Sequence, residues 1–530
     1  HSTSTQDTLD VTHTSSGISS GGNMRIHASN ALTTVGSSIQ SGGDMDASAK
    51  TMDFGAAQDV HETRQSSSDT SVGLYFDASA SATGKANAHA GAEQNGVTSH
   101  AGGSASASGE AKVQAEAGLY GTNTTSNSVS GSTHAVTSSL KAGGNMTRNA
   151  TNSIHDTGTA IEAGGDFSQS AQTITSDAAH DTTYASSNST TNTLRIGVQG
   201  QASASGSAAA DADISAKGKS QNSTATGTAT AGAALRVSYE NDQSHDSSAT
   251  STAVVSTIKA GGKVSSTSSG KTSLEGTKIT SGGDTELNAG SLDYRAAANT
   301  STSTTTNSKG TGELKIDPIK KEGSLSGGYG TQTEKETSST AVVGGINSGG
   351  KLKINTTGDA RLEGTQLKSA GGADLNVGGN LAVDAARNTQ TKETKGLDVQ
   401  ATIGGGKSGG SKSGALSASG AYTDSKSSAS QAVVSDISSG AGLNIHTGGS
   451  ATLEGTTINT KGDANIDAKN GVNFTAARDT ESHQSLSVSA SLAASGSKSA
   501  GGTNAETGES KGPSSTKSGQ IGAEGQYVKG

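Results

Sequence analysis

A glycine-rich run ending in lysine and serine is the first pattern in this sequence that could do chemistry. Residues Gly404 to Ser408 read Gly-Gly-Gly-Lys-Ser and are similar to a loop whose backbone amides cradle phosphate groups. That loop requires a glycine where Ala401 stands and a helix directly after it, and no helical periodicity follows. We therefore interpret the run as the tip of a β-hairpin.

Three aspartates, Asp44, Asp166 and Asp284, each follow a Gly-Gly pair and are the next candidates for a site. Calcium-binding repeats need Gly-Gly-x-Gly-x-Asp in tandem, which the sequence lacks. A polysaccharide lyase built on a β-helix needs paired carboxylates on adjacent turns, whereas here one aspartate recurs per copy of a repeat. We expect these residues to form corners, and we expect no catalytic, cofactor-binding or metal-binding residue.

Histidine and cysteine usage also argues against a metal site. The 12 histidines are scattered without the His-x-x-x-His spacing and acidic partner of a zinc site, and cysteine is absent. A chain without cysteine has no disulfide scaffold and suits a protein that crosses membranes unfolded. Because the sequence starts at His1 without a signal peptide or a long apolar stretch, we expect an internal piece of a longer exported chain.

The composition argues against ordinary globular domains. Apolar residues make up 29% and aromatic residues 2% of the chain, too little to fill a layered core. A disordered chain and a repetitive β-structure with a thin core both remain compatible with this. The net charge of -9 is spread without long runs of one sign, so neither a nucleic-acid surface nor a polybasic membrane patch is expected.

A degenerate repeat with a fixed internal spacing decides between these two classes. In each of five copies an aliphatic residue precedes a glycine corner, and a second such residue follows 21 residues later. Disorder does not keep such a spacing, whereas one turn of a β-helix has about this length. The aliphatic residues, predicted to form the rung core, are Ile18, Ile39, Leu140, Ile161, Ile258, Ile279, Ile346, Leu367, Ile437 and Ile458. The predicted corner glycines are Gly21, Gly22, Gly42, Gly43, Gly143, Gly144, Gly164, Gly165, Gly261, Gly262, Gly282, Gly283, Gly349, Gly350, Gly371 and Gly372.

Between these landmarks apolar and polar residues alternate, as in Lys351-Leu352-Lys353-Ile354, which is the period of a strand. Each glycine pair supplies positive φ or a close backbone approach at a corner. Two turns per copy, stacked at about 4.8 Å, predict a rod roughly 48 Å long. A solenoid of this kind needs caps, and we find none at either terminus. An alanine pair, such as Ala56-Ala57 or Ala296-Ala297, follows the second turn of most copies.

The remainder of each copy is a predicted insert with a common plan. A Ser/Thr stretch leads into alternating residues, a Gly/Ser/Lys-rich tip, and a return that reaches a tyrosine. We predict hairpins with arms of about ten residues, projecting roughly 33 Å, that pair with neighbouring hairpins because isolated ones are marginal in water. Flexible spacer loops and assembly against a membrane are the alternatives. The return tyrosines are Tyr120, Tyr239, Tyr329, Tyr422 and Tyr527.

These landmarks divide the chain into an opening segment and five repeats. Residues 1–17 are predicted to be the end of a preceding insert. The repeats, with their approximate inserts in parentheses, are 18–139 (58–135), 140–257 (180–253), 258–345 (299–341), 346–436 (388–432) and 437–530 (from 478).

The repeat resembles the second haemagglutinin-repeat region of filamentous haemagglutinin and of contact-dependent growth inhibition toxins, which are exoproteins of two-partner secretion. The resemblance rests on Ile-x-Ser/Ala-Gly-Gly-x-Met runs and on Leu-Glu-Gly-Thr runs at Leu274, Leu362 and Leu453, and it covers nearly the whole chain. It implies an all-β, right-handed parallel β-helix on a giant surface protein. It supplies no catalytic residue.

The predicted function follows from this resemblance. We expect a non-catalytic β-solenoid stalk segment of a secreted bacterial adhesin or toxin-delivery protein, acting in cell contact and in delivery of a C-terminal effector. One alternative is a membrane-associated conduit made by the hairpins for toxin translocation across a target outer membrane, and another is a β-helical polysaccharide lyase. The expected partners are an outer-membrane transporter during export, the chain's own continuation at both ends, a target-cell surface or membrane, and no nucleic acid. The expected location is the cell surface or the medium, with the periplasm before full export.

Overall fold

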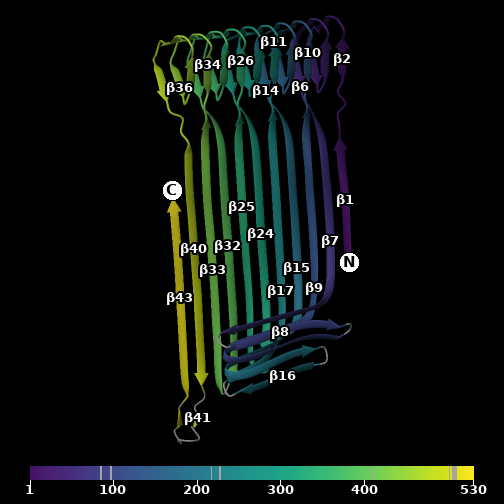
Figure 1. The fold of residues 1–530 in the computed structure, drawn as a ribbon, viewed down its shortest axis with the longest axis vertical. Helices are drawn as coiled ribbons and strands as arrows, with labels where there is room; N and C mark the ends of the chain where they lie inside the picture. Colours follow the sequence, from purple (N-terminus) through teal and green to yellow (C-terminus); the bar gives the residue numbers. More distant parts are fainter. Residues whose placement is uncertain are drawn as a thin grey trace.

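The computed structural model describes residues 1–83, 86–95, 98–215, 218–225, 228–408, 410–499, 502–503, 510–511 and 513–529. Within these ranges it describes side chains everywhere except at residues 83–110, 205–229, 502–511 and 529. Within these ranges the chain forms strands and no helix. A parallel β-helix carries a broad antiparallel sheet of long hairpins, which extends from it in one direction (Figure 1). The expected fold class, an all-β solenoid with hairpin inserts, is confirmed.

Each turn of the solenoid places one short strand segment on each of three faces. The first face is a ten-stranded parallel sheet in the described residues. It contains β2 (Gly17–Ser20), β5 (Ser38–Ser41), β10 (Ser139–Ala142), β12 (Ala160–Ala163), β18 (Thr257–Ala260), β21 (Lys278–Ser281), β26 (Gly345–Ser348), β29 (Gln366–Ser369), β34 (Asp436–Ser439) and β37 (Thr457–Thr460).

The second and third faces are also parallel, and two long strands, β6 (Met45–Gly55) and β11 (Met146–Thr157), run continuously over both. The second face adds β3 (Met24–His27), β13 (Phe167–Ala171), β19 (Val264–Ser268), β22 (Thr285–Ala289), β27 (Leu352–Thr356), β30 (Ala373–Val377), β35 (Leu443–Thr447) and β38 (Ala464–Ala468). The third face adds β4 (Ala31–Val35), β14 (Thr173–Asp177), β20 (Lys271–Glu275), β23 (Ser291–Arg295), β28 (Ala360–Glu363), β31 (Leu381–Asp384), β36 (Ala451–Glu454) and β39 (Val472–Thr475).

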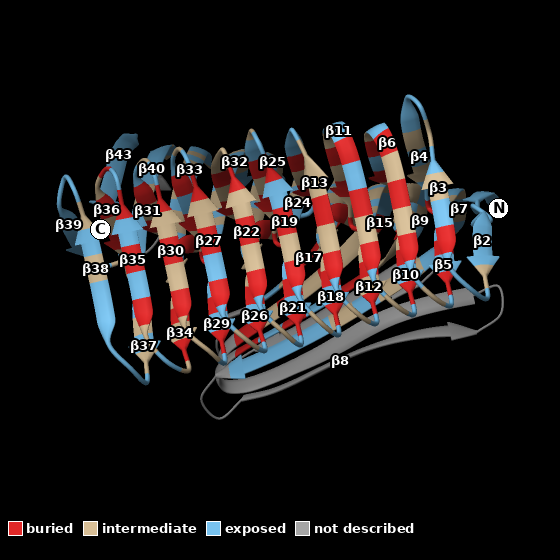
Figure 2. Cartoon of the chain, turned by 90° about the horizontal axis from the view of Figure 1, so that it is seen from above, coloured by how far each residue is buried: buried red, intermediate tan, exposed pale blue. Residues whose placement is uncertain are grey.

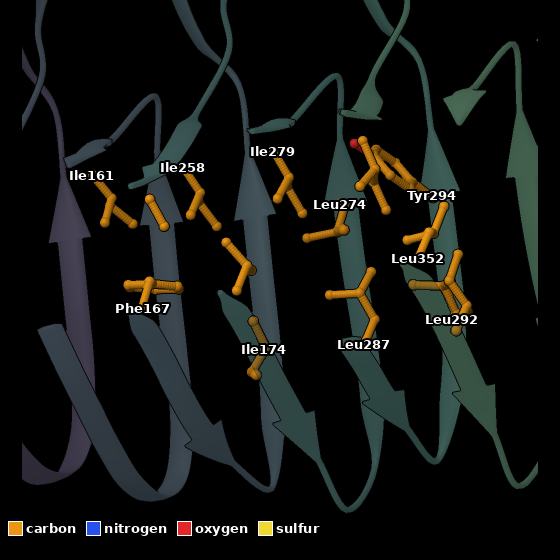
Figure 3. Close-up of a cluster of buried hydrophobic side chains, with 14 of the residues drawn as sticks. Ile161, Phe167, Ile174, Ile258, Leu274, Ile279, Leu287, Leu292, Tyr294 and Leu352 are labelled. Carbon is orange, nitrogen blue, oxygen red and sulfur yellow. The ribbon is translucent and has the colours of Figure 1, made fainter. Parts of the chain in front are cut away.

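The ten aliphatic residues singled out in the sequence lie in a single ladder on the first face. Each is paired in register with the next, from Ile18 through to Ile458. The inner eight are between 0% and 4% exposed, so each contributes roughly 1.5–3 kcal/mol of hydrophobic stabilisation. Figure 2 shows buried residues along the solenoid strands, and Figure 3 shows Ile161, Ile258 and Ile279 in one row. Ile18 is 59% exposed and Ile458 is half-buried, because they lie in the two end rungs.

The glycine pairs form corners through close backbone approach. A Cβ added to Gly143, Gly164 or Gly261 would lie 2.2 Å from the carbonyl oxygen of the first glycine in the rung before it. A Cβ on the second glycine, as at Gly144 or Gly262, would lie 2.3 or 2.0 Å from the carboxylate of an aspartate in that rung. The pairs thus let corners stack at the strand spacing.

Positive φ occurs at another corner of each repeat, outside the glycine pairs. Gly276 has φ 57°, and the equivalent Gly36, Gly158, Gly364 and Gly455 lie between 56° and 61°. At each of these points the third face leads straight into the next rung. A Cβ on Gly276 would lie 2.6 Å from Val255 and 2.9 Å from Ala297, where one hairpin returns and the next departs. Positive φ and lack of space both require glycine there.

The inserts form hairpins that share one antiparallel sheet, as expected, but their arms are longer than predicted. The third hairpin has 21 residues in each arm and the fourth has 23 in each, instead of about ten. The Ser/Thr stretches, which the sequence predicts to lead into the arms, pair in full, because threonine suits a strand whose two faces are both solvated. The sheet contains β1 (Ser2–Val11), β7 (Ala57–Thr83), β9 (Thr98–Val136), β15 (Ala179–Ser215), β17 (Thr228–Val254), β24 (Ala297–Asp317), β25 (Glu322–Val342), β32 (Ala386–Ser408), β33 (Ser411–Val433), β40 (Thr480–Ser499) and β43 (Ser514–Lys529).

Shorter strands lie beyond the arms of three inserts. They are β8 (Ala86–Asn95) in the first, β16 (Gly218–Ala225) in the second, and β41 (Gly502–Thr503) with β42 (Ser510–Lys511) in the last. β8 pairs with β9 and β16 with β15. The predicted tips of these inserts include residues outside the described ranges.

One charged pair lies inside the solenoid and was not anticipated from the sequence. Arg148 is fully buried and donates two hydrogen bonds, of 2.8 and 2.9 Å, to the carboxylate of Asp156. It donates a third to Gln169, and its guanidinium lies 5.2 and 5.5 Å from the ring centres of Phe54 and Phe167. Its charge is therefore compensated by a carboxylate and two aromatic faces.

We predict that Gly261→Ala destabilises its rung by about 2 kcal/mol, because the new methyl group must displace the stacked corner. Gly21→Ala is the matched control, since a Cβ there meets nothing within 4 Å. Hydrogen exchange of the first-face strands measures both variants. Equal protection in the two would contradict the stacking account.

We also predict that Asp156→Asn costs about 3–5 kcal/mol, because it leaves the Arg148 guanidinium buried without its counter-charge. The double variant Arg148→Met, Asp156→Leu should recover most of this loss by apolar packing. Hydrogen exchange over residues 139–177 reports the local stability. A double variant less stable than Asp156→Asn would mean that the ion pair itself stabilises the core.

Candidate functional site in the hairpin sheet

An apolar row crosses the hairpin sheet from strand to strand. Residues that pair directly in adjacent strands share one face of a sheet, and the register places eight aliphatic residues opposite one another across β7, β9, β15, β17, β24, β25, β32 and β33. At about 4.8 Å per strand the row is nearly 40 Å long. We call this row the apolar ladder; it consists of Leu74, Leu119, Ile196, Val237, Leu314, Leu325, Ile403 and Leu416.

The apolar ladder is widened by its neighbours and is exposed. Seven of its eight side chains are 41% to 57% exposed, with Val237 half-buried. Flanking rows on the same face add Leu194, Leu235, Ile316, Val399 and Leu492, each at least 40% exposed. We call this side of the sheet the stripe face. An exposed apolar strip on the order of 800 Å² exceeds what a monomer surface usually leaves uncovered and marks an interaction site.

Four of the five return tyrosines lie on the stripe face. Tyr239, Tyr329 and Tyr422 pair with Leu194, Val399 and Leu397, and Tyr527 pairs with Leu486. They are 37% to 56% exposed. Tyr120 points to the other face, because it pairs with Gly73 and Arg195, and its ring covers Gly73.

The opposite face carries a polar network instead of an apolar row. Tyr75 donates a hydrogen bond to Glu116, which also accepts one from Arg236 at 2.9 Å. Arg236 in turn donates to Glu313 at 2.6 Å, so the network joins β7, β9, β17 and β24. Burial and the hydrogen bond to Glu116 raise the pKa of Tyr75, and the bonds to Glu313 and Glu116 raise the pKa of Arg236. Both shifts therefore arise from contacts between neighbouring strands and, for Tyr75, from burial as well.

Each hairpin is attached to the preceding one by a side-chain clamp at its base. An Asp or Asn two residues after the alanine pair accepts a hydrogen bond of 2.7–2.8 Å from a backbone N–H of the preceding return strand or loop. The recurring signal Ala-Ala-x-Asp/Asn could have identified this clamp in the sequence. The acceptors are Asp59, Asp181, Asn299, Asn388 and Asp479, and their donors are His13, Ala135, Ala253, Ala341 and Ala432.

The aspartates that follow the glycine pairs have a similar backbone role. Asp44, Asp166 and Asp284 accept bonds of 2.7 Å from the backbone N–H of Asn145, Lys263 and Lys351 in the next rung. The described residues contain no cluster of three or more His, Asp or Glu side chains able to hold a metal ion. Gly404 to Ser408 lie at the end of strand β32, in extended conformation. No helix that could span a bilayer occurs in the part of the chain that the structure describes.

This arrangement defines a class of protein: a parallel β-solenoid whose recurring polar residues bond to backbone, combined with a flat hairpin sheet that has one exposed apolar face. Comparison with known proteins gives the family. The hemagglutinin repeat family matches residues 1–119, 119–237, 237–402 and 416–528, and the chain belongs to this family of filamentous haemagglutinin type. It is therefore part of a secreted or cell-surface exoprotein.

One curated relative matches this chain over part of its own length. A protein named hemolysin from Serratia marcescens is 29% identical over 265 residues, which are 49% of this chain and 16% of that protein. The chain therefore spans about a sixth of the relative that it matches. No solved structure matches the chain.

We predict a pH-dependent clamp at Asp59. The hydrogen bond from the His13 backbone holds the pKa of Asp59 below its ordinary value of 3.8. A depressed folded-state pKa means that the clamp stabilises above the ordinary carboxyl pKa and is lost as the pH falls through the lower folded value. Asp59→Asn should remove this pH dependence while keeping the acceptor, as Asn299 and Asn388 do naturally.

Amide exchange at His13, corrected for its intrinsic rate, measures this effect between neutral pH and pH values below 3.8. We expect protection to fall with acid in the native chain and to stay level in Asp59→Asn. Asp59→Ala, which removes the acceptor, should lack the protection at every pH. Identical acid profiles for the native chain and Asp59→Asn would rule out the carboxylate as the acceptor.

Proposed function

We propose that the chain is a non-catalytic β-solenoid stalk segment of a large secreted bacterial adhesin or contact-dependent toxin-delivery protein. Its role is in cell contact and in the presentation or delivery of a C-terminal effector. The observation that carries the proposal is the use of the recurring polar residues: Asp44, Asp166 and Asp284 bond to backbone of the next rung instead of converging on a site. This favours a stalk over a polysaccharide lyase.

The partners in this proposal follow from the exposed surfaces. The end rungs leave apolar side chains such as Ile18 and Phe474 59% and 63% exposed, which supports coverage by further rungs of the same protein. An outer-membrane transporter acts during export. The net charge of -9 argues against nucleic acid. A target-cell surface is the remaining partner.

A second candidate function is a membrane-associated conduit in which the hairpins assist toxin passage across a target outer membrane. The exposed apolar ladder favours this candidate, because it presents one continuous aliphatic row to the surroundings. The length of the arms is compatible with it as well, since 21 residues of strand extend roughly 70 Å from the solenoid.

Deletion of a whole structural unit tests the stalk role in the intact secreted protein. Removing 258–345 joins Thr257 to Ile346 and takes out two rungs together with one hairpin, so the ladder of the first face stays in register. We expect export and cell contact to persist. Loss of cell contact by a folded, exported protein would instead place a specific receptor or conduit site in this unit.

Removal of residues 258–278, a single rung, is the matched control. The two neighbouring hairpins would then leave the solenoid only one rung apart. Each hairpin needs the width of two strands, and one rung provides the width of one, so the hairpin sheet should not fold.

The triple variant Asp44→Asn, Asp166→Asn, Asp284→Asn tests whether the chain is a polysaccharide lyase. Under the stalk proposal this variant keeps cell contact.

A further inference from the structure

The stripe face changes character towards the C-terminal strands β32, β33, β40 and β43, which lie side by side at one end of the hairpin sheet (Figure 1). Lys407 pairs with Lys412, and Lys412 pairs with Lys498, so three lysines occupy one row on three neighbouring strands. Lys517 on β43 lies one row nearer the solenoid, opposite Gly496. All four lysines are exposed.

This lysine row has no counter-charge among the described residues. The ion pairs of the hairpin sheet involve other lysines, such as Lys309 with Glu240 and Lys426 with Glu393. Like charges placed directly opposite in a sheet destabilise it. The row is therefore suited to an anion supplied from outside the described part of the chain.

Nearer the solenoid than the lysine row, the stripe face contains a shallow apolar trough. A row of glycines, including Gly405, Gly414 and Gly496, separates the lysines from Ile403 and Leu416 of the apolar ladder. Beyond the ladder lies a trough of 730 Å³. Small residues such as Ala401, Ala418, Gly420, Ala490 and Ala523 line its floor, and Tyr329, Val399, Leu492 and Ile521 line it as well.

The lysines and the apolar trough lie one after the other along the same strands. From Lys412 to Gly420 the strand β33 covers roughly 27 Å, enough for an extended acyl chain below its headgroup. Long lysine side chains can lay their methylene stems on apolar surface while the ammonium groups contact phosphate. We propose that this part of the stripe face binds membrane lipids with anionic headgroups, with the headgroup on Lys407, Lys412, Lys498 and Lys517 and the acyl chains in the trough.

The positive charge of the lysine row indicates which kind of molecule binds this part of the stripe face. A second copy of the chain could pack on the stripe face, related to the first by a twofold axis parallel to the strands. The lysines would then lie opposite Ala78, Ala115 and Gly200 of the first two hairpins, and these residues supply no anion. A soluble anion would satisfy the lysines but leave the apolar ladder and the trough uncovered. An anionic lipid matches both parts of the surface. The proposal is independent of the stalk role.

Flotation of the purified chain with vesicles tests the proposal. We expect partitioning onto phosphatidylcholine vesicles that contain phosphatidylglycerol, weakened by salt, and little onto phosphatidylcholine alone. The variant Lys407→Gln, Lys412→Gln, Lys498→Gln, Lys517→Gln should lower partitioning at least about tenfold. The control Lys278→Gln, Lys351→Gln, Lys368→Gln, Lys461→Gln makes the same change of net charge on exposed solenoid lysines and should bind as the native chain does.

A second pair of variants tests the trough. Ala418→Glu places a carboxylate on the stripe face and should abolish binding, whereas Ser417→Glu places it on the opposite face of the same strand and should not. Hydrogen exchange of β32, β33 and β40 checks that each variant is folded. Equal binding by Ala418→Glu and Ser417→Glu would overturn the trough as the acyl-chain site.

Two further results would overturn the proposal as a whole. Saturable binding of inorganic phosphate that displaces the chain from vesicles at constant ionic strength would identify a soluble-anion site. Self-association that Ala418→Glu abolishes, without any partitioning onto vesicles, would identify a second copy as the occupant. Failure of lipid binding leaves the unit-deletion result on cell contact unaffected, so the two proposals fail separately.

Discussion

The distance that two rungs cover along the solenoid axis equals the width that the two strands of a hairpin occupy in the sheet. Both repeats are set by the backbone hydrogen bond, at about 4.8 Å per strand. Because a hairpin leaves after every second rung, each new hairpin arrives beside the last one with no gap and no overlap. The fixed spacing of 21 residues between Ile258 and Ile279 keeps this match, since it holds the number of rungs per hairpin at two. The hairpin sheet depends on that equality.

The junction residues are those that this match constrains most. Where the chain passes from one rung to the next beside a departing hairpin, Gly276 adopts positive φ and packs against Ala297, which has the smallest side chain that still has a Cβ. Asn299 then bonds back to the preceding hairpin at Ala253. A larger residue at either small position would push the hairpin away from its neighbour and lengthen that bond. The glycine, the alanine and the clamp therefore act as one unit, repeated at each exit.

The sequence predicts the solenoid better than the hairpins for a physical reason. The first-face ladder has one buried side, so its aliphatic residues recur at a spacing that a single sequence reveals. The arms are solvated on both faces near the solenoid, and threonine and serine there give no alternation that marks the strand, so the sequence pattern predicts arms that are too short. The apolar ladder depends on register between strands as distant as β7 and β33, and Arg148 depends on partners in other strand segments, so neither follows from local spacing.

The same register explains why hairpins of unequal length still build one continuous surface. Leu74, Ile196, Leu314 and Ile403 each lie 17 residues after the second alanine of the pair that opens the hairpin, which places them in one row. Beyond that row the hairpins differ: Leu119 lies 45 positions after Leu74, but Leu325 lies 11 positions after Leu314. Because the register of every arm is fixed at its base on the solenoid, hairpins of different length differ only at their tips. The residues of the stripe face therefore keep the same rows in every hairpin. The tips can differ in length without changing this register.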